Sequence, residues 1–270
     1  MKKLQLFQID AFASYLFGGN PAAVCPLETW ISDEQMQSIA TENNLSETAF
    51  IVPQGNEYEI RWFTPNSEVA LCGHATLASA FVLFECLGFQ KEEILFHSKS
   101  GELKVKKVGD VLQMDFPALP FERMSLDAPF CKSLNLEPQE VYDSTFDLLF
   151  IFKTEQEVKE ACPDLQAISR LNKRGVILSA PGTQADVYSR CFYPGCDVPE
   201  DPVTGSAHCV ITPYWCERLG KKKINAVQGL KRQGELTCEI INERVILSGS
   251  CQLYLQGHLF YLNTPEIGSL

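Results

Sequence analysis

One stretch of the chain is apolar around the whole turn of a helix, and a second is mostly apolar. They span residues 75–84 and 207–219, and they close at Gly88 and Gly220. A helix without a polar face is buried on all sides, and glycine commonly ends a helix. The pattern therefore predicts two central helices, one in each half of the chain. Pro213 is expected either in the first turn of the second helix or at a kink within it.

Most other regular segments read as strands, several of them with alternating apolar and polar residues. We expect strands at residues 4–9, 48–52, 58–62, 103–105, 112–116, 176–180, 187–192, 236–241 and 245–248, followed by two more. The turns at Gly109-Asp110 and Asn242-Glu243 predict two hairpins. Residues 121–173 are charged and favour helix. A surface helix is expected from Ser32 to about Asn44, because Ser32 and Gln35 have the spacing of a capping box.

The order of these elements predicts a mixed α+β fold. Strands and helices do not alternate regularly, and the glycine-rich motifs of nucleotide-binding sheets do not occur in the sequence. The length of 270 residues suits two domains of about 135 residues each. Pro117 and Pro120 suggest a boundary near residue 118. We therefore expect domains at residues 1–118 and 119–270, with the option that the last few residues cross back to the first.

A block of sequence occurs once in each half. The first copy runs from Arg61-Trp-Phe-Thr-Pro to Glu68-Val-Ala-Leu-Cys-Gly-His-Ala, and the second from Arg190-Cys-Phe-Tyr-Pro to Glu200-Asp-Pro-Val-Thr-Gly-Ser-Ala. Each copy leads directly into one of the two apolar helices. The duplication predicts two similar domains that face each other, with a shared site between two helix N-termini.

Composition narrows the class of partner. The net charge of −11 argues against nucleic acid and anionic membranes, although a local site can still bind a small anion. The sequence has no apolar run of 18 residues and no apolar segment of a signal peptide near its start. The 11 cysteines are odd in number and irregularly spaced, which favours reduced thiols in the cytoplasm. The four histidines are scattered, so no metal site is expected.

The repeated block points to an anion-binding site. Gly73-His74 and Gly205-Ser206 would each open a buried helix, whose first N–H groups are unpaired and carry partial positive charge. Glycine at such a position lets a ligand approach the backbone closely. Two such ends could hold a carboxylate or stabilise an enolate. Each glycine alone is more simply a turn residue, and the duplication favours the site.

Four side chains compete for a chemical role near these helix ends. His74 stands at the start of the first helix, where we expect the helix dipole to lower its pKa and keep it neutral. Glu47 and Asp201 are candidate proton carriers, although a surface glutamate and an acidic helix start are both ordinary. Cys72 could be a thiolate base. A symmetric pair of thiols is disfavoured, because Thr204 fills the matching place in the second copy.

Five motifs in order resemble the PhzF, or phenazine biosynthesis-like, family over nearly the whole chain. They are Gly19-Asn-Pro-Ala-Ala-Val, Asn44-Leu-Ser-Glu-Thr, Trp62-Phe-Thr-Pro, Cys72-Gly-His-Ala-Thr and Glu200-Asp-Pro-Val-Thr-Gly-Ser-Ala. The resemblance implies the diaminopimelate-epimerase-like fold. In this fold two pseudosymmetric domains each wrap a curved, mostly antiparallel sheet around a central buried helix, and the active site lies in the cleft between them.

The resemblance also implies roles for individual residues. Glu47 would be the general acid/base and His74 and Asp201 the assisting polar pair. The substrate contacts expected in this sequence are Asn20, Gly73, Gly205 and Ser206. The implied activity is that of a cofactor-free isomerase that moves a proton on a small carboxylate, and a homodimer fits the family.

Two alternatives stay open at this point. One is an epimerase or racemase that uses Cys72 as a base. The other is a protein of this fold that binds a metabolite or a partner protein without turnover.

Overall fold

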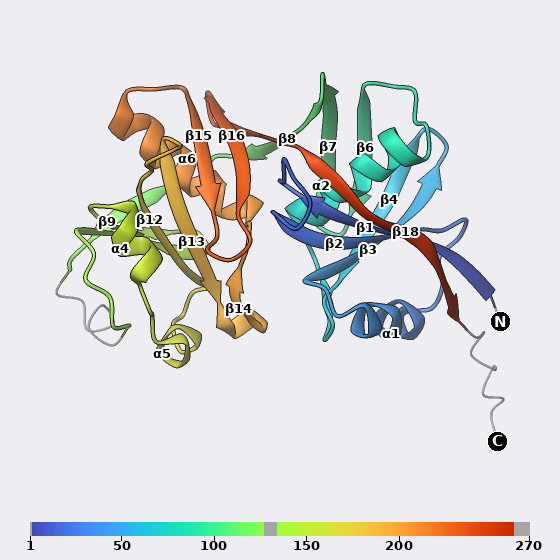
Figure 1. Cartoon of the computed structure of the whole chain (residues 1–270), viewed down its shortest axis with the longest axis horizontal. Coiled ribbons are helices and arrows are strands. Elements are labelled where there is room, and N and C mark those ends of the chain that lie inside the picture. The colour runs from blue at the N-terminus through green and yellow to red at the C-terminus, as the bar shows by residue number, and fades with distance from the viewer. Residues whose placement is uncertain (1, 127–133, 262–270) are drawn as a thin grey trace.

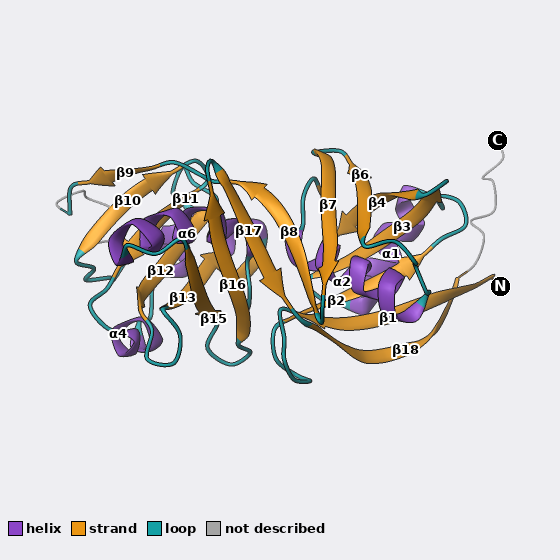
Figure 2. Ribbon diagram, turned by 90° about the horizontal axis from the view of Figure 1, so that it is seen from above, coloured by secondary structure: helices purple, strands orange, loops and turns teal. Residues whose placement is uncertain are grey.

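The computed structural model describes residues 2–126 and 134–261 and has two lobes, each with strands around one central helix (Figures 1 and 2). In the first half the helices are α1 (Asp33–Asn43), α2 (Gly73–Phe81) and the π-helical turn η1 (Val82–Cys86). The strands of this half are β1 (Lys2–Ala11), β2 (Asn20–Pro26), β3 (Glu47–Gln54), β4 (Glu57–Phe63), β5 (Glu68–Val69), β6 (Glu93–Ser98), β7 (Gly101–Val108) and β8 (Val111–Pro117).

The second half has the same kind of architecture. Its helices are α4 (Glu155–Glu160), α5 (Leu165–Ser169), α6 (Gly205–Leu219) and the 3₁₀ turn η2 (Pro194–Cys196). Its strands are β9 (Phe121–Met124), β10 (Glu140–Ser144), β11 (Asp147–Ile151), β12 (Gly175–Pro181), β13 (Val187–Tyr193), β14 (Val198–Asp201), β15 (Lys223–Gln228), β16 (Gly234–Ile241) and β17 (Arg244–Gly249). The last strand, β18 (Cys251–Tyr261), leaves this half.

The order of strand pairings is the same in both halves. In the first, β1 to β4 are neighbours in order, β4 pairs with β6, and β6, β7 and β8 follow. In the second, β10 to β13 are neighbours in order, β13 pairs with β15, and β16 and β17 follow. Even the parallel pairs match, since β2–β3 corresponds to β11–β12 and β4–β6 to β13–β15. The duplication therefore covers the whole fold of each half, and the expected α+β class is confirmed.

Two sheet contacts join the halves. Strand β17 pairs antiparallel with β8, and β18 crosses over to pair along the full length of β1 (Figure 2). The chain thus returns to its first half after residue 250. The buried apolar side chains around α2 and α6 form one continuous cluster, while smaller clusters lie under α1 and under α4 and α5. The division at residue 118 stays a prediction.

The repeated Arg and Glu form the same ion pair in each half. Arg61 donates from Nε and Nη2 to the two carboxylate oxygens of Glu68, both at 2.8 Å. Arg190 does the same with Glu200, at 2.8 and 3.0 Å. Bidentate pairs of this kind fix geometry strongly. They tie strand β4 or β13 to the short strand that precedes α2 or α6, so this part of the repeated block is structural.

Several local predictions are confirmed. Helix α1 starts at the N-cap Ser32 with a complete capping box to Gln35, and it ends at Asn44 in the left-handed conformation. The hairpins β7–β8 and β16–β17 turn where expected. Helix α6 ends at Gly220 with a φ of 63°.

Other predictions about local structure are wrong. Residues 121–173 were expected to favour helix, yet they contain three strands, β9 to β11, besides the short helices α4 and α5. These strands are only four or five residues long, and every residue of β11 is buried, so no alternation marks it. Strands β2, β5, β6, β14 and β15 were missed. Among the described residues one strand follows β17, where two were expected. Pro213 lies inside α6, beyond its first turn, so of the two expected options the kink stays a prediction.

Glycine at position 175 is required by packing at the start of β12. A methyl group there would lie 2.1 Å from the carbonyl oxygen of Phe192 and 2.4 Å from Cδ1 of Tyr193. We expect Gly175→Ala to lower the free energy of unfolding by about 1–3 kcal/mol, the usual cost of overpacking, measured by urea denaturation. Gly195→Ala is the control, because nothing lies within 4 Å of its added methyl, and it should change stability by less than about 0.5 kcal/mol. Equal stability of the two variants would contradict this packing.

Candidate active site

A cavity of about 160 Å³ lies between the two halves, at the N-termini of α2 and α6. Both halves contribute to it in nearly equal measure. Its walls are formed by Ser46, Glu47, Val69, Leu71, Cys72, Gly73, His74, Arg174, Tyr193, Cys196, Val198, Asp201, Thr204, Gly205 and Ser206. The structure therefore brings together all the predicted site residues except Asn20, which lies behind the wall.

The two helix ends face each other at Gly73 and Gly205. A methyl group on Gly73 would lie 3.8 Å from Cα of Gly205, and one on Gly205 would lie 3.9 Å from Cα of Gly73. These are ordinary contact distances, so packing alone would accept alanine at either position. In the described structure neither helix has a hydrogen bond from the side chain of its N-cap residue, Cys72 or Thr204. The first N–H groups are thus available to an anion, and the glycines leave room for it.

Glu47 and His74 meet at the cavity. Glu47 is the first residue of β3 and His74 the second residue of α2. Oε2 of Glu47 lies 3.1 Å from Nε2 of His74, a hydrogen-bonding distance without the alignment of a hydrogen bond. Both atoms are buried and have no aligned partner within the described ranges. The two buried atoms face each other, so a proton shared between them would satisfy both.

Asn20 ties the polar groups of the two halves together. Its amide nitrogen lies 2.7 Å from Oδ1 of Asp201, 3.0 Å from the carbonyl oxygen of Val203 and 3.2 Å from Nδ1 of His74. Its carbonyl oxygen accepts a hydrogen bond from Ser46. The side chain is fully buried. Asn20 was expected to contact the substrate, and the structure instead gives it the geometry of a residue that positions His74 and Asp201.

Asp201 has an environment that favours its neutral form. Burial, opposed by the nearby His74 and assisted by the charge of Glu47, raises the pKa of this carboxyl to about 6. Hydrogen bonds from Thr204, at 2.5 Å, and from Asn20 act in the opposite direction. A carboxyl with this pKa can both give and take a proton near neutral pH.

The expected lowering of the His74 pKa is wrong. Burial does lower the pKa of this imidazole, but Cys72 and Glu47 outweigh burial and hold it well above its ordinary value. Burial raises the pKa of the Cys72 thiol itself to about 11, so its sulfur is uncharged at neutral pH. Glu47 is then the group that favours a protonated His74. The helix dipole, the basis of the prediction, is weaker than a carboxylate in direct contact.

Arg174 and Tyr193 are site residues that the sequence did not reveal. Arg174 donates from Nε to Asp147 at 2.9 Å and from Nη1 to Ser206 at 2.8 Å, and its guanidinium lies 4.8 Å from the ring centre of Tyr193. Arg174 directly precedes β12, outside the repeated block and one residue after the segment expected to favour helix. A basic residue next to the buried run that starts at Gly175 was the available signal.

The pairing register identifies what corresponds to Arg174 in the first half. Thr48 pairs with Phe63, and Val176 pairs with Phe192, the matching phenylalanine of the repeated block. Thr48 on β3 therefore corresponds to Val176 on β12. The residues directly before them, Glu47 and Gly175, correspond to each other. One position further back, Ser46 corresponds to Arg174. The first half thus carries a carboxylate where the second half has a glycine, and the second half carries a cation beside it.

Glu47, Cys72 and His74 present three ligand-type atoms within 4.8 Å of one another. A tetrahedral metal site needs them to converge on one ion. The imidazole, however, faces Glu47 with Nε2 and Cys72 with Nδ1, 3.5 Å from its sulfur. The two partners therefore meet opposite nitrogens of one ring. The arrangement suits proton transfer better than a metal, and a metal-free site stays a prediction.

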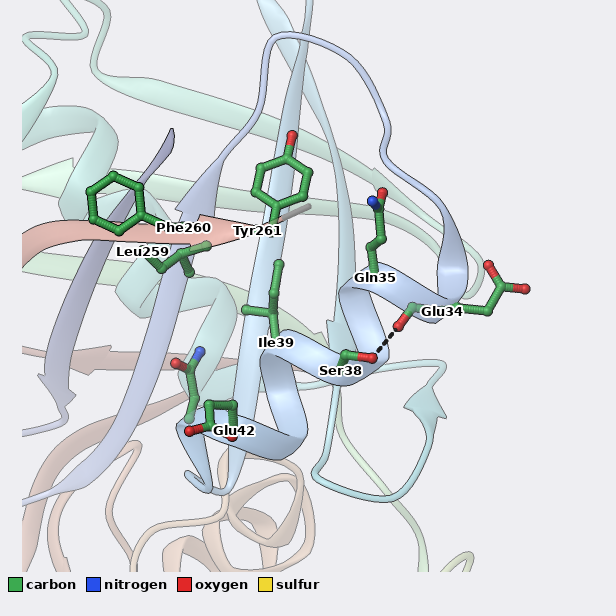
Figure 3. Close-up of a pocket in the computed structure, with 9 residues that line it drawn as sticks. Glu34, Gln35, Ser38, Ile39, Glu42, Leu259, Phe260 and Tyr261 are labelled. Atoms are coloured by element: carbon green, nitrogen blue, oxygen red, sulfur yellow. Dashed lines mark hydrogen bonds between the residues drawn. The ribbon is translucent and has the colours of Figure 1, made fainter. Parts of the chain in front are cut away.

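A larger depression of about 360 Å³ lies elsewhere, between α1 and the end of β18 (Figure 3). Ile39, Leu259 and Tyr261 line it, together with the carboxylate-bearing Glu34 and Glu42. Among the described residues around it there is no basic side chain, so it does not favour an anion. The smaller cavity between the halves has the titratable groups and is the better candidate for chemistry.

No helix among the described residues has the length and apolar character needed to cross a membrane. The cysteines of the described ranges are all free, and most of them are buried.

Comparison with known proteins gives one consistent result. Residues 9–257 match the family model of phenazine biosynthesis-like proteins, PhzC-PhzF. A Pseudomonas aeruginosa protein named an uncharacterized isomerase is 47% identical over 257 residues, which cover 95% of this chain and 99% of that one. The crystal structure of a PhzF family protein from Enterococcus faecalis is 43% identical, with a TM-score of 0.93 over 96% of this chain and 100% of that chain.

A more distant likeness shows the fold alone. The structure of a hydroxyproline epimerase from Agrobacterium vitis has a TM-score of 0.60 at 10% identity, covering 97% of this chain and 94% of that one. Together these comparisons confirm the expected fold, since PhzF-type and epimerase-type proteins share the same two-lobed architecture.

The raised pKa of Asp201 predicts a pH-dependent stability. Its folded-state value of about 6 exceeds the ordinary 3.8, so the folded state binds the proton more tightly. The protein is favoured below about pH 4, and this advantage is lost as the pH rises to about 7. Relative to Asp201→Asn, the wild type should lose about 2–3 kcal/mol of unfolding free energy over that range.

Urea unfolding at several pH values measures this difference. Asp115→Asn, which changes a half-exposed carboxylate paired with Arg244, is the control and should follow the wild type within about 0.5 kcal/mol. A pH-independent difference between the wild type and Asp201→Asn would show that the pKa of Asp201 is the same in the folded and unfolded states.

Proposed function

The chain belongs to the phenazine biosynthesis-like (PhzF) family, and we propose that it is a cofactor-independent isomerase that moves a proton on a small carboxylate. The observation that carries the proposal is the contact between Glu47 and His74 at the cavity. A carboxylate that lines the cavity 3.1 Å from an imidazole of raised pKa forms a pair that can exchange protons with a ligand. The isomerase names of similar proteins support the reaction class.

The proposed reaction has two proton transfers. The Glu47 carboxylate takes a proton from a carbon next to, or conjugated with, the substrate carboxylate, and the electron pair of the broken C–H bond moves into the carboxylate as an enolate. Glu47, now protonated, returns the proton to a different carbon of the unsaturated substrate. The carbon–carbon double bond of the substrate changes position as a result. N–H groups at Gly73 and Gly205 stabilise the enolate. Loss of one such donor typically costs about 10²–10³ in rate.

The neighbouring groups have supporting roles in this scheme. His74 faces Glu47 with Nε2, and Asn20 lies between His74 and Asp201 and fixes their relative positions. Asp201, with a pKa near 6, can exchange a proton with the site as charge develops. His74 and Asp201 are buried, and the low dielectric around them strengthens these interactions.

The epimerase alternative depends on Cys72 as a base. Its thiol pKa of about 11 leaves very little thiolate at neutral pH, and the matching position of the second half is Thr204. Both observations disfavour a two-base reaction between thiols. A protein that only binds a metabolite or a partner does not need a carboxylate and an imidazole in contact at its cavity, so the contact of Glu47 and His74 disfavours this alternative.

Glu47→Gln should abolish proton exchange. The test incubates a panel of small unsaturated carboxylates with enzyme in deuterated water and follows deuterium at carbon by NMR. We expect the exchange rate to fall by about 10²–10⁴, the usual contribution of a positioned base. Glu42→Gln changes an exposed glutamate of the α1 depression and should keep the parental rate. The proposal fails if folded Glu47→Gln exchanges at the parental rate, and tight binding with no exchange by the wild type favours a binding protein.

Cys72→Ala separates the isomerase from the epimerase. An isomerase that uses Glu47 should keep most of its exchange rate in this variant, whereas removal of a general base costs about 10²–10⁴-fold. The same NMR assay measures the rate, and the urea unfolding midpoint confirms the fold. A loss of activity as large as that of Glu47→Gln would favour the epimerase.

A further inference from the structure

We propose that Arg174, Ser206 and Tyr193 form the wall that binds the substrate carboxylate, and that this wall orients the substrate toward Glu47. The inference rests on the proposed function and adds to it the place, the orientation and the charge of the ligand. All three residues line the cavity from the second half. Ser206 was an expected contact because of its helix position, whereas no role had been expected for Arg174 or Tyr193.

Arg174 is fixed in place and still has hydrogen atoms to donate. Asp147, which is buried, accepts from its Nε and Nη2, and Ser206 accepts from Nη1. A guanidinium has five N–H groups, so two remain after these three bonds. The ring of Tyr193 covers one side of the guanidinium plane. The side chain is 31% exposed, and its remaining N–H groups suit a carboxylate.

The hydroxyl of Ser206 is turned into a donor by Arg174. Its oxygen accepts the N–H of Nη1 at 2.8 Å, so its own hydrogen points elsewhere. Ser206 is also the second residue of α6, where its backbone N–H belongs to the unpaired set of the helix end. The side chain and the backbone of one residue thus offer two donors at the same place.

Tyr193 adds a third donor whose present partner is weak. Its buried hydroxyl has no oxygen or nitrogen partner among the described residues and contacts only the thiol of Cys191. Cys191 acts on it electrostatically, but a thiol is only a weak acceptor. Burial raises the pKa of Tyr193 well above its ordinary value, so the hydroxyl keeps its hydrogen. A buried donor of this kind is satisfied when a ligand oxygen occupies the cavity.

The wall fixes the direction in which a substrate lies. Arg174 corresponds by register to Ser46, the neighbour of Glu47, so the cation and the base belong to opposite halves. A carboxylate on the second half directs the adjacent carbons toward Glu47 and His74 on the first. Arg174 and His74 are the only basic side chains in the described lining, and His74 is paired with Glu47. The site therefore fits one carboxylate, and the substrate class is a small monocarboxylate.

Binding of benzoate and of benzamide tests the proposal without any turnover. The two probes have the same shape and differ in charge, and isothermal titration calorimetry measures both affinities. The wild type should prefer benzoate by about tenfold or more, and Arg174→Met should remove the preference, the change expected when charge-assisted hydrogen bonds are lost. Equal affinity of the two probes for the wild type, including no binding of either, would overturn the proposal.

Arg232→Met is the matched control. Arg232 is also 31% exposed and also pairs with a buried aspartate, Asp10, but it lies outside the cavity lining. Both variants leave a buried carboxylate without its arginine, so both should lose stability. Only Arg174→Met should lose the preference for benzoate. An equal loss of preference in both variants would show that Arg174 acts through the fold alone, which overturns the proposal.

Tyr193→Phe keeps the test decisive if Arg174→Met does not fold. It removes only the hydroxyl, whose present partner is the weakly accepting thiol of Cys191, and it should weaken benzoate binding severalfold while leaving benzamide binding nearly unchanged. Unchanged benzoate affinity in this variant counts against the wall. Arg174→Lys keeps the positive charge but lacks the planar guanidinium with its several N–H donors. It should retain part of the preference for benzoate that Arg174→Met loses.

The outcome is separable from that of the proposed function. Glu47→Gln should keep the preference for benzoate, because the wall does not include Glu47. If the preference depends on Arg174 but no carboxylate exchanges protons, the wall stands and the isomerase fails. If exchange depends on Glu47 and is unaffected by Arg174→Met in both KM and kcat, the wall fails and the isomerase stands.

Discussion

The end-to-end approach of two helices through Gly73 and Gly205 is the constraint on which the site depends. Two helix N-termini carry partial charges of the same sign, so their contact across the halves is unfavourable without an anion. The chain brings them together by packing α2 and α6 into one apolar cluster and by pairing β8 with β17. The fold thus holds together two helix ends that repel each other electrostatically. A carboxylate or enolate between the ends relieves this repulsion.

Duplication supplies the frame, and its broken symmetry supplies the chemistry. The ion pairs Arg61–Glu68 and Arg190–Glu200 are equivalent and hold equivalent strands. By contrast, Glu47 corresponds to Gly175 and Ser46 to Arg174, so one half carries a base and the other a cation. A symmetric cavity would bind a ligand in two orientations. An asymmetric one selects the orientation in which a single base can remove a proton and return it.

The sequence predicted those features that depend on local pattern or on repetition. The two buried helices, the helix ends at Gly73 and Gly205 and the capping box of α1 all follow from residues close together in the chain. Features that depend on distant contacts were missed or misjudged. Arg174 became part of the site through Asp147 and Ser206, and the pKa of His74 was set by Glu47 rather than by its own helix. Asn20 lies in a motif of the family and was expected to contact the substrate, whereas the structure buries it behind the cavity wall. The sequence around a single polar residue does not show whether that residue is buried.

A crystal structure with benzoate bound tests the central claim most directly. The account predicts that the carboxylate lies between the ends of α2 and α6, within hydrogen-bonding distance of Arg174 and Ser206, with the ring directed toward Glu47. Benzoate bound with its carboxylate at Glu47, or only in the depression between α1 and β18, would contradict it.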